Sequence, residues 1–260
     1  MLHVACVEGR GDTQKFKQTK KLSLEESARL LRYQFLKKEA RKFNHAKIVL
    51  AHHLNDQVET FFVNLLKGAG LGGLSGMKPL DGRLARPLLT VTKKEILRYL
   101  EIQNVRYCVD ETNLHETILR NRVRAKLLPF LEEQFAWNIY KTLPRMMRVW
   151  KAEHETLESV VSYWFSERIE KKAYGYAMGV KTFLQSPVSV QRRIIKRIVD
   201  KLSTKRHYSS MHIERNRRLF MNPVSGKKVL LPEGIIAEKS KEEVVWRSFK
   251  PNRLEGDNPS

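Results

Sequence analysis

The stretch that decides the fold is residues 47–60, KIVLAHHLNDQVET. Its first part is apolar and β-favouring, so it predicts a buried strand that ends at two histidines. Asn55 is a good N-cap, and the apolar residues after it repeat at helical spacing. A strand that runs directly into a helix is typical of a wound α/β sheet, which binds ligands at the carboxyl ends of its strands.

Two acids open the predicted helix. At about 100° per residue, Asp56 and Glu59 lie one turn apart, opposite the apolar stripe, and can face one ligand together. The predicted stripe consists of Val58, Phe61, Phe62, Leu65 and Leu66. His52 and His53 would stand at the same rim of the sheet. An alternative stays open, because the helix dipole alone favours acids in a first turn and histidines at strand ends are commonly ordinary polar residues.

A glycine-rich segment follows at residues 68–79, GAGLGGLSGMKP. So many glycines predict neither helix nor strand but a loop that reverses the chain or approaches a ligand closely. The spacing matches neither a Walker loop nor a dinucleotide fingerprint, so a plain hinge is the alternative.

In this order, residues 52–79 and the following Arg86-Pro87-Leu88-Leu89 resemble the PP-loop ATP pyrophosphatase family, and within it the tRNA(Ile)-lysidine synthetases. The two adjacent acids usual in that family stand here as Asn55-Asp56. Residues 110–113, DETN, and 119–124, LRNRVR, resemble the family's Asp-x-Thr-Asn turn and Arg-Asn-x-x-Arg helix.

Arg120 and Arg124 are one turn apart on that predicted helix. They can present two guanidinium groups to phosphates, although a solvated basic helix face is the alternative.

The resemblance implies a reaction and its site. ATP would adenylate the wobble cytidine of an isoleucine tRNA with a CAU anticodon, and free lysine would then attack to form lysidine. Asp56, Glu59 and His52 would act in catalysis: the two acids would hold Mg²⁺ or the lysine ammonium, and His52 would hydrogen-bond the nucleotide or developing charge. His53, Arg120 and Arg124 would bind the nucleotide. The residues expected to contact RNA are Arg86, Arg122, Arg192, Arg193, Lys196 and Arg197.

The family also begins with a strand that leads into a Ser-Gly-Gly-x-Asp-Ser loop, which these 260 residues lack. We therefore expect an N-terminally incomplete synthetase, whose exposed apolar surface would be covered by a homodimer partner or a complementing N-terminal segment. The alternatives are a non-catalytic basic RNA-binding remnant and a tRNA-thiolating PP-loop relative. The two cysteines, Cys6 and Cys108, form no Cys-x-x-Cys pair, which argues against thiolation, a disulfide scaffold and a zinc site.

Composition agrees with an RNA-facing protein. Lys and Arg number 49 against 28 Asp and Glu, so the formal net charge is +21 and the pI is near 10.0. Such a chain is attracted to polyanions, although charge alone does not separate RNA from DNA or an anionic membrane. Without a long apolar run or a signal peptide, we expect a cytoplasmic protein and no membrane partner.

The predicted fold class is α/β: a partial PP-loop (adenine nucleotide alpha hydrolase-like) parallel-sheet domain at 1–130, then a smaller, mainly helical tRNA-binding domain at 131–260. Ser23 with Glu26, and Thr92 with Glu95, predict helix starts. Further expected elements are helices at 21–43, 138–170 and 188–202, strands at 226–234 and 244–246 that form a terminal β-hairpin, and a disordered tail from 250.

Overall fold

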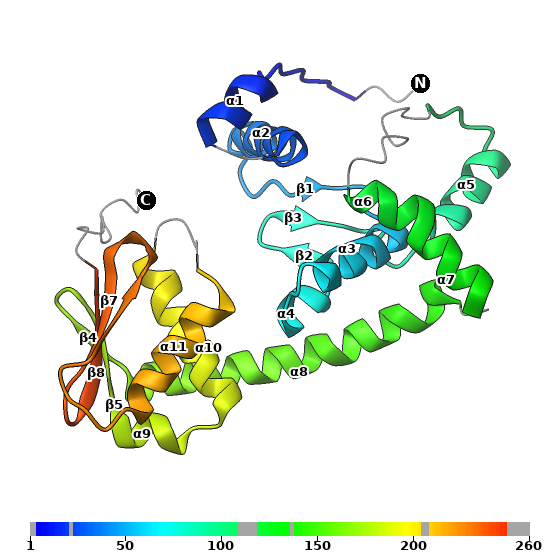
Figure 1. Ribbon diagram of the computed structural model, residues 1–260. Helices are drawn as coiled ribbons and strands as arrows, with labels where there is room; N and C mark the ends of the chain where they lie inside the picture. Colours follow the sequence, from blue (N-terminus) through cyan, green and yellow to red (C-terminus); the bar gives the residue numbers. More distant parts are fainter. Residues whose placement is uncertain (1–3, 21–22, 109–118, 136–137, 204–207, 249–260) are drawn as a thin grey trace. The chain divides into compact units, whose positions relative to one another are not determined.

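The computed structural model describes residues 4–20, 23–108, 119–135, 138–203 and 208–248 (Figure 1). Its contacts divide the chain into two compact units, Met1–Trp150 and Lys151–Ser260. The division falls inside one long helix, α8 (Ile139–Arg168), which the helical spacing of residues 138–170 predicted. The functional domains expected at 1–130 and 131–260 stay a prediction.

The first unit is α/β and contains a small three-stranded sheet in the order β1-β3-β2 (Figure 1). Its strands are β1 (Ile48–Val49), β2 (Leu80–Asp81) and β3 (Leu84–Ala85). β1 and β3 are parallel, whereas β2 and β3 form an antiparallel hairpin. The α/β class is confirmed, but the described sheet is mixed and not wholly parallel.

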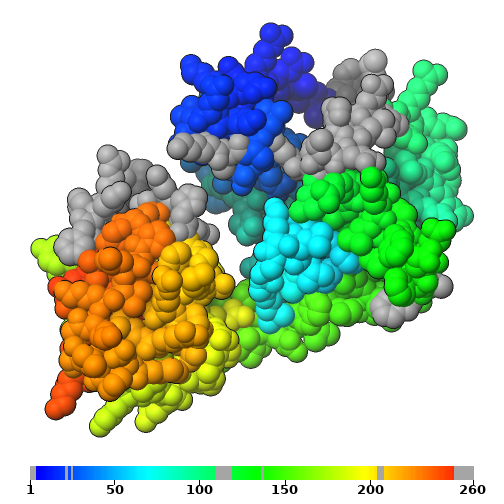
Figure 2. Space-filling view, in the orientation of Figure 1, coloured from blue at the N-terminus to red at the C-terminus, as the bar shows by residue number. Residues whose placement is uncertain are grey.

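Helices surround this sheet. In the space-filling view, the cyan residues of α3 and α4 lie against the green residues of α6 and α7 (Figure 2). The helical elements of the first unit are α1 (Thr13–Lys20), α2 (Leu24–Ala40), α3 (Leu54–Leu66), α4 (Leu71–Leu74), α5 (Lys93–Ile102), α6 (Leu119–Arg122), the π-helical turn η2 (Val123–Leu127), α7 (Leu128–Phe135) and the start of α8.

Capping residues begin the helices. Thr92 and Glu95 form the predicted capping box of α5, and Ser23 accepts a hydrogen bond from the Glu26 N–H at the start of α2. The expected cap of α3 is wrong: His53 is the N-cap, and Asn55 lies inside the helix. Asn55 is used elsewhere, because its Oδ1 accepts a 2.8 Å hydrogen bond from the N–H of Lys93 at the start of α5.

The glycine-rich segment is not wholly a loop. It contains the single-turn helix α4, whose residue Leu71 accepts a hydrogen bond from the Ser75 N–H, so the expectation of no helix there is wrong. Gly68 and Gly76 flank this turn with φ of 71° and 73°, a left-handed conformation that side chains rarely adopt. A Cβ on Gly76 would also lie 2.6 Å from Gln57 Oε1, so the Gln57 side chain would have to move.

The core of the first unit joins α3 to η2, α7 and α8. Its buried members are Val58, Phe61, Val123, Leu128, Ile139, Leu143 and Met147. Phe61 also stacks on Trp150, with ring centroids 5.8 Å apart. The predicted stripe is correct at Val58 and Phe61 but wrong at Leu65 and Leu66, whose side chains are exposed because the last turn of α3 extends past this core.

The second unit contains an antiparallel sheet in the order β4-β5-β8-β7-β6, with helices beside it (Figure 1). The expected strands are confirmed as β6 (Lys228–Leu231) and β8 (Glu243–Ser248), and the expected helix as α10 (Val188–Leu202). The hairpin expected between these two strands is wrong, because β7 lies between them and pairs with both. The elements that the sequence analysis did not predict are β4 (Glu170–Lys172), β5 (Gly175–Gly179), α9 (Val180–Gln185), α11 (Ser210–Met221), the 3-10 turn Pro232–Gly234 and β7 (Ile235–Lys239).

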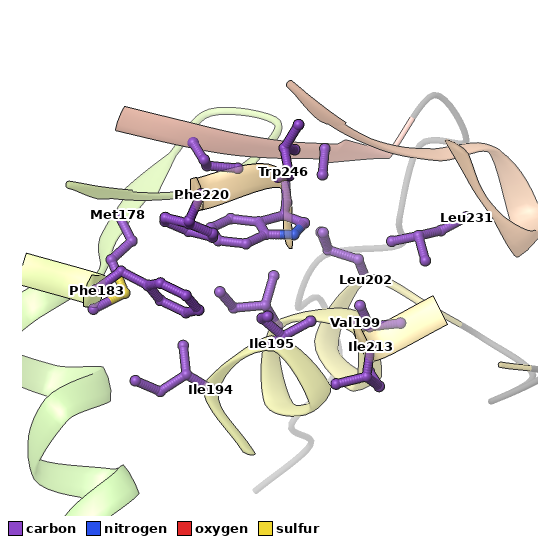
Figure 3. Packing of buried hydrophobic residues seen from close by; sticks show 14 of the residues in the cluster. Met178, Phe183, Ile194, Ile195, Val199, Leu202, Ile213, Phe220, Leu231 and Trp246 are labelled. Carbon is purple, nitrogen blue, oxygen red and sulfur yellow. The ribbon is translucent and has the colours of Figure 1, made fainter. Parts of the chain in front are cut away.

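The apolar face of α10 and the inner face of this sheet form the larger core (Figure 3). Phe183 stacks on Phe220 with ring centroids 3.6 Å apart, and Phe220 contacts the ring of Trp246. Trp246 is fully buried and donates from Nε1 to Asn216 Oδ1 over 3.0 Å, so its polar atom is satisfied. This sheet and its helices therefore have a core of their own.

Candidate functional site

Four charged side chains meet where α3 packs on α6 and η2. Asp56 and Glu59 come from the first turns of α3, and Arg120 and Arg124 come from α6 and η2. The two arginines are far from the acids in sequence but contact both of them directly. The structure therefore brings together four of the residues that the sequence analysis selected.

Glu59 is at the centre of this cluster. Its side chain is only 2% exposed. Glu59 Oε1 accepts a 2.5 Å hydrogen bond from Arg124 Nε, and Oε2 accepts bonds of 2.7 Å from Arg120 Nε and 2.9 Å from Arg124 Nη2. An isolated buried carboxylate would be strongly unfavourable, and these charge-assisted bonds offset the cost of burying Glu59.

Asp56 is the second acid of the cluster and lies nearer its surface than Glu59 does. Its Oδ1 accepts a 2.8 Å bond from Arg120 Nη2, and its Oδ2 accepts a 2.9 Å bond from the backbone N–H of His53. Two carboxylates and two guanidinium groups balance in formal charge. Within the described residues, no group of three or more His, Cys, Asp or Glu side chains is placed to hold a metal ion.

Glu59 also raises the pKa of Arg124, chiefly through the hydrogen bonds it accepts. Each oxygen of the two carboxylates already accepts a hydrogen bond, and the two guanidinium groups repel a cation at this position. The roles of Asp56 and Glu59 as metal ligands stay a prediction.

His52 follows β1 and is partly buried beside this cluster. Burial lowers the pKa of its imidazole; Asp56 partly offsets this effect, and the charges of Arg86, Arg29 and Arg120 lower the pKa further. Its buried Nδ1 has no hydrogen-bond partner among the described residues. The lowered pKa favours the neutral imidazole of His52 at pH 7.

His53 contributes differently. As the N-cap of α3 it donates its backbone N–H to Asp56, and its Nδ1 lies 3.4 Å from Asp56 Oδ2. The structure therefore places His53 beside the acid that it positions. The contact of His53 with nucleotide stays a prediction.

Tyr140 is a neighbour of the site that the sequence analysis missed. Burial raises the pKa of its hydroxyl, as do the nearby charges of Glu132 and Glu59, while a side-chain hydrogen bond with Asn55 lowers it. Asn55 thus connects α3 to both α5 and α8. A tyrosine just inside the predicted start of α8 was the available signal, but its spacing alone did not indicate contact with α3.

Arg86 lies inside the first unit. It is 6% exposed, and its Nη1 donates a 2.8 Å hydrogen bond to the carbonyl of Lys78. Gln57, which the sequence analysis did not select, holds the same segment: its amide donates to the Met77 carbonyl and accepts from the Met77 N–H. These contacts fasten the end of the glycine-rich segment to α3, so the RNA contact expected of Arg86 stays a prediction without support from its position.

The basic side chains of α10 are paired within the second unit. Glu158 of α8 accepts bonds of 2.5 Å from Arg193 and 2.6 Å from Arg197. Lys196 pairs with Asp200 at 2.9 Å, and Arg192 pairs with Glu214 at 3.1 Å. RNA would have to compete with these acids, so the predicted RNA-binding face of α10 is largely neutralised. Arg122 is exposed.

The predicted Asp110–Asn113 turn and the tail from Lys250 lie outside the described residues. Cys6 and Cys108 are both exposed, free thiols. No helix in the described ranges is both long enough and apolar enough to span a membrane.

Sequence comparisons match this chain to several proteins named tRNA(Ile)-lysidine synthase. It is 32% identical over 237 residues to the tRNA(Ile)-lysidine synthase of Clostridium perfringens, which covers 91% of this chain and 50% of that protein. The protein of the same name from Caldanaerobacter subterraneus is 31% identical over 232 residues, which cover 88% of this chain and 49% of the relative. The one from Chlorobaculum tepidum is 35% identical over 193 residues, which cover 72% of this chain and 57% of the relative.

The chain thus spans about half the length of the curated relatives it matches first. The sequence profile of the PP-loop domain matches residues 1–131, which include the whole cluster of Asp56, Glu59, Arg120 and Arg124. This chain therefore belongs to the PP-loop domain family.

Proposed function

We propose that this chain carries the site at which a tRNA(Ile)-lysidine synthetase activates its RNA base. The observation that carries the proposal is the cluster of Arg120 and Arg124 with Asp56 and Glu59, which adjoins the carboxyl end of β1. Open α/β sheets bind ligands at that end of their strands. The names of the relatives support the choice of lysidine formation among PP-loop reactions.

In the proposed reaction, the carbonyl oxygen of the wobble cytosine attacks the α-phosphorus of ATP, and pyrophosphate leaves. The amine of free lysine then attacks the activated ring carbon, adenylate leaves, and the amine loses a proton. Arg120 and Arg124 would transfer hydrogen bonds from the carboxylates to phosphate oxygens, since paired guanidinium groups match phosphate geometry. We also propose the cytoplasm as the compartment of this reaction, because tRNA, ATP and free lysine occur there together.

Once the two arginines have moved their hydrogen bonds to the phosphate oxygens, the carboxylates of Asp56 and Glu59 would attract a cation. Asp56 and Glu59 are oxygen ligands of the kind that Mg²⁺ prefers, and their negative charge also suits the lysine ammonium. When bound there, Mg²⁺ would supply charge neutralisation for the leaving pyrophosphate. Neutral His52 can donate or accept one hydrogen bond at the nucleotide.

Replacement of Glu59 by glutamine tests this proposal. Glu59→Gln keeps the shape but removes the charge that holds both arginines, so lysidine formation should fall by about 10²-fold or more, while tRNA binding changes little. The measurement is mass spectrometry of nucleosides from isoleucine tRNA incubated with ATP, magnesium and lysine. It uses the chain alone and the chain joined to the amino-terminal PP-loop segment of a complete relative, because these 260 residues contain no Ser-Gly-Gly-x-Asp-Ser loop.

Glu133→Gln is the matched control, because Glu133 is an exposed acid on α7 outside the cluster. This control should retain the parent rate. Lysidine formation by Glu59→Gln at the parent rate would show that the cluster only stabilises the start of α3. If neither parent form produced lysidine while both bound tRNA, the proposal would fail in favour of a non-catalytic RNA-binding protein.

A further inference from the structure

The first half of α8 carries a one-sided positive charge that the site above does not use. Between Asn138 and Ala152 the sequence has four basic side chains and no acidic one. Three of them, Lys141, Arg145 and Arg148, are exposed. At about 100° per residue they fall within a sector of roughly 60°, opposite the buried side of this helix. We call these three residues the α8 basic stripe.

The α8 basic stripe is not neutralised by its own unit. None of its side chains forms an ion pair with another side chain in the part of the chain that the structure describes. The cations of α10 differ, because each of the four expected to bind RNA has a carboxylate partner. Lys141, Arg145 and Arg148 are therefore a group of exposed cations on one face of α8 that have no carboxylate partner among the described residues.

Helix stability does not account for the stripe. Lys141 lies in the first turn of α8, where the helix dipole favours acids over cations. Arg145 follows it by four residues and Arg148 follows Arg145 by three, and like charges at these spacings destabilise a helix. A polyanion lying along this face would relieve both effects.

We propose that the α8 basic stripe binds the phosphate backbone of the tRNA substrate. The three cations span about 10 Å at a rise of 1.5 Å per residue, enough to contact more than one phosphate. Nothing in the stripe is suited to reading base edges, so these contacts add affinity without sequence preference. This inference rests on the proposed function, because it takes tRNA as the ligand.

The test is a charge-neutral triple variant, Lys141→Gln with Arg145→Gln and Arg148→Gln. It should weaken tRNA binding roughly tenfold near physiological salt, and the plot of log affinity against log salt should become less steep by about 2. Isoleucine tRNA and an unrelated tRNA should lose affinity equally. Filter binding at several salt concentrations measures all three quantities, and circular dichroism checks that α8 still forms.

The matched control removes the same net charge at scattered exposed lysines. It combines Lys94→Gln, Lys181→Gln and Lys241→Gln, none of which has an ion-pair partner among the described residues. This control should keep more of the parent affinity and the parent salt slope.

Equal losses in the two triple variants would overturn the inference, because net charge alone would then explain binding. If the parent chain does not bind tRNA at all, the proposed function fails, whereas tRNA binding without salt dependence would overturn the α8 basic stripe alone. Loss of binding to phosphatidylserine vesicles with tRNA binding unchanged would assign the α8 basic stripe to a membrane surface instead.

Discussion

At the scale of single residues, burial decides which charged groups are available to a ligand. Arg86 and Arg122 both fit a basic RNA-binding pattern in the sequence, but Arg86 is buried against the Lys78 carbonyl and Arg122 is exposed. The guanidinium of Arg86 is surrounded by its own chain, so its expected role is to fix backbone.

Replacement of Arg86 separates these roles. Arg86→Leu should lower the free energy of unfolding by about 1–3 kcal/mol, because the Lys78 carbonyl loses a charged donor in a buried place. Urea denaturation measures this change, and the exposed Arg83→Leu is the control that should be nearly silent. An unchanged stability together with weaker tRNA binding would instead support the RNA contact predicted from the sequence.

At the scale of elements, one acid of α8 holds two arginines of α10. Burial alone would raise the pKa of Glu158, but hydrogen bonds from Arg197 and Arg193 bring it below its ordinary value. The folded-state pKa is therefore lower than the unfolded one. The stability that this pair of contacts contributes is present above the unfolded pKa, near 4.5, and is lost as pH falls through the folded value.

Because folding lowers the pKa of Glu158, we predict that the effect of replacing this residue depends on pH. Glu158→Gln should lower the stability of the second unit at pH 7, and its difference from the parent should shrink as the pH falls below about 4.5. Thermal unfolding followed at several pH values checks the trend. Glu155→Gln is the control, since Glu155 is 57% exposed and lies 3.9 Å from Lys151, and it should show little difference at any pH. A Glu158→Gln difference that stays constant with pH would contradict the pairing.

At the scale of the whole molecule, the two buried clusters share no residue. Phe61 belongs to the core around α3, and Trp246 belongs to the core beneath α10. Each is a large buried aromatic, so truncation to alanine should cost about 3–5 kcal/mol within its own unit. Sites without shared partners usually add.

We therefore expect Phe61→Ala and Trp246→Ala to have additive effects on the free energies of unfolding, each confined to one unit. Calorimetry of the two single variants and the double variant measures this. A double variant that differs from the sum by more than about 0.5 kcal/mol would show that the cores are coupled.

The sequence by itself determined the features that depend on nearby residues. The capping box of Thr92 and Glu95, the length of α8 and the bounds of α10 were all predicted, because a helix is specified by side chains within a turn or two of one another. The family motif also selected the four residues of the charged cluster. The motif selected these residues by their type and spacing, but it did not indicate that the two acids and the two arginines would neutralise each other.

Only the tertiary structure decided which residues pair across the chain. Arg120 meets Glu59 across 61 positions, and β5 finds its partner β8 only after α9, α10 and α11 have intervened. β5, with the sequence GYAMG, carries no clear strand pattern until β8 supplies its hydrogen bonds. The same holds for the α8 basic stripe, which differs from the basic face of α10 because the α10 side chains have carboxylate partners in the folded chain. Such pairings depend on long-range chain closure and on the burial of charge, which no local pattern encodes.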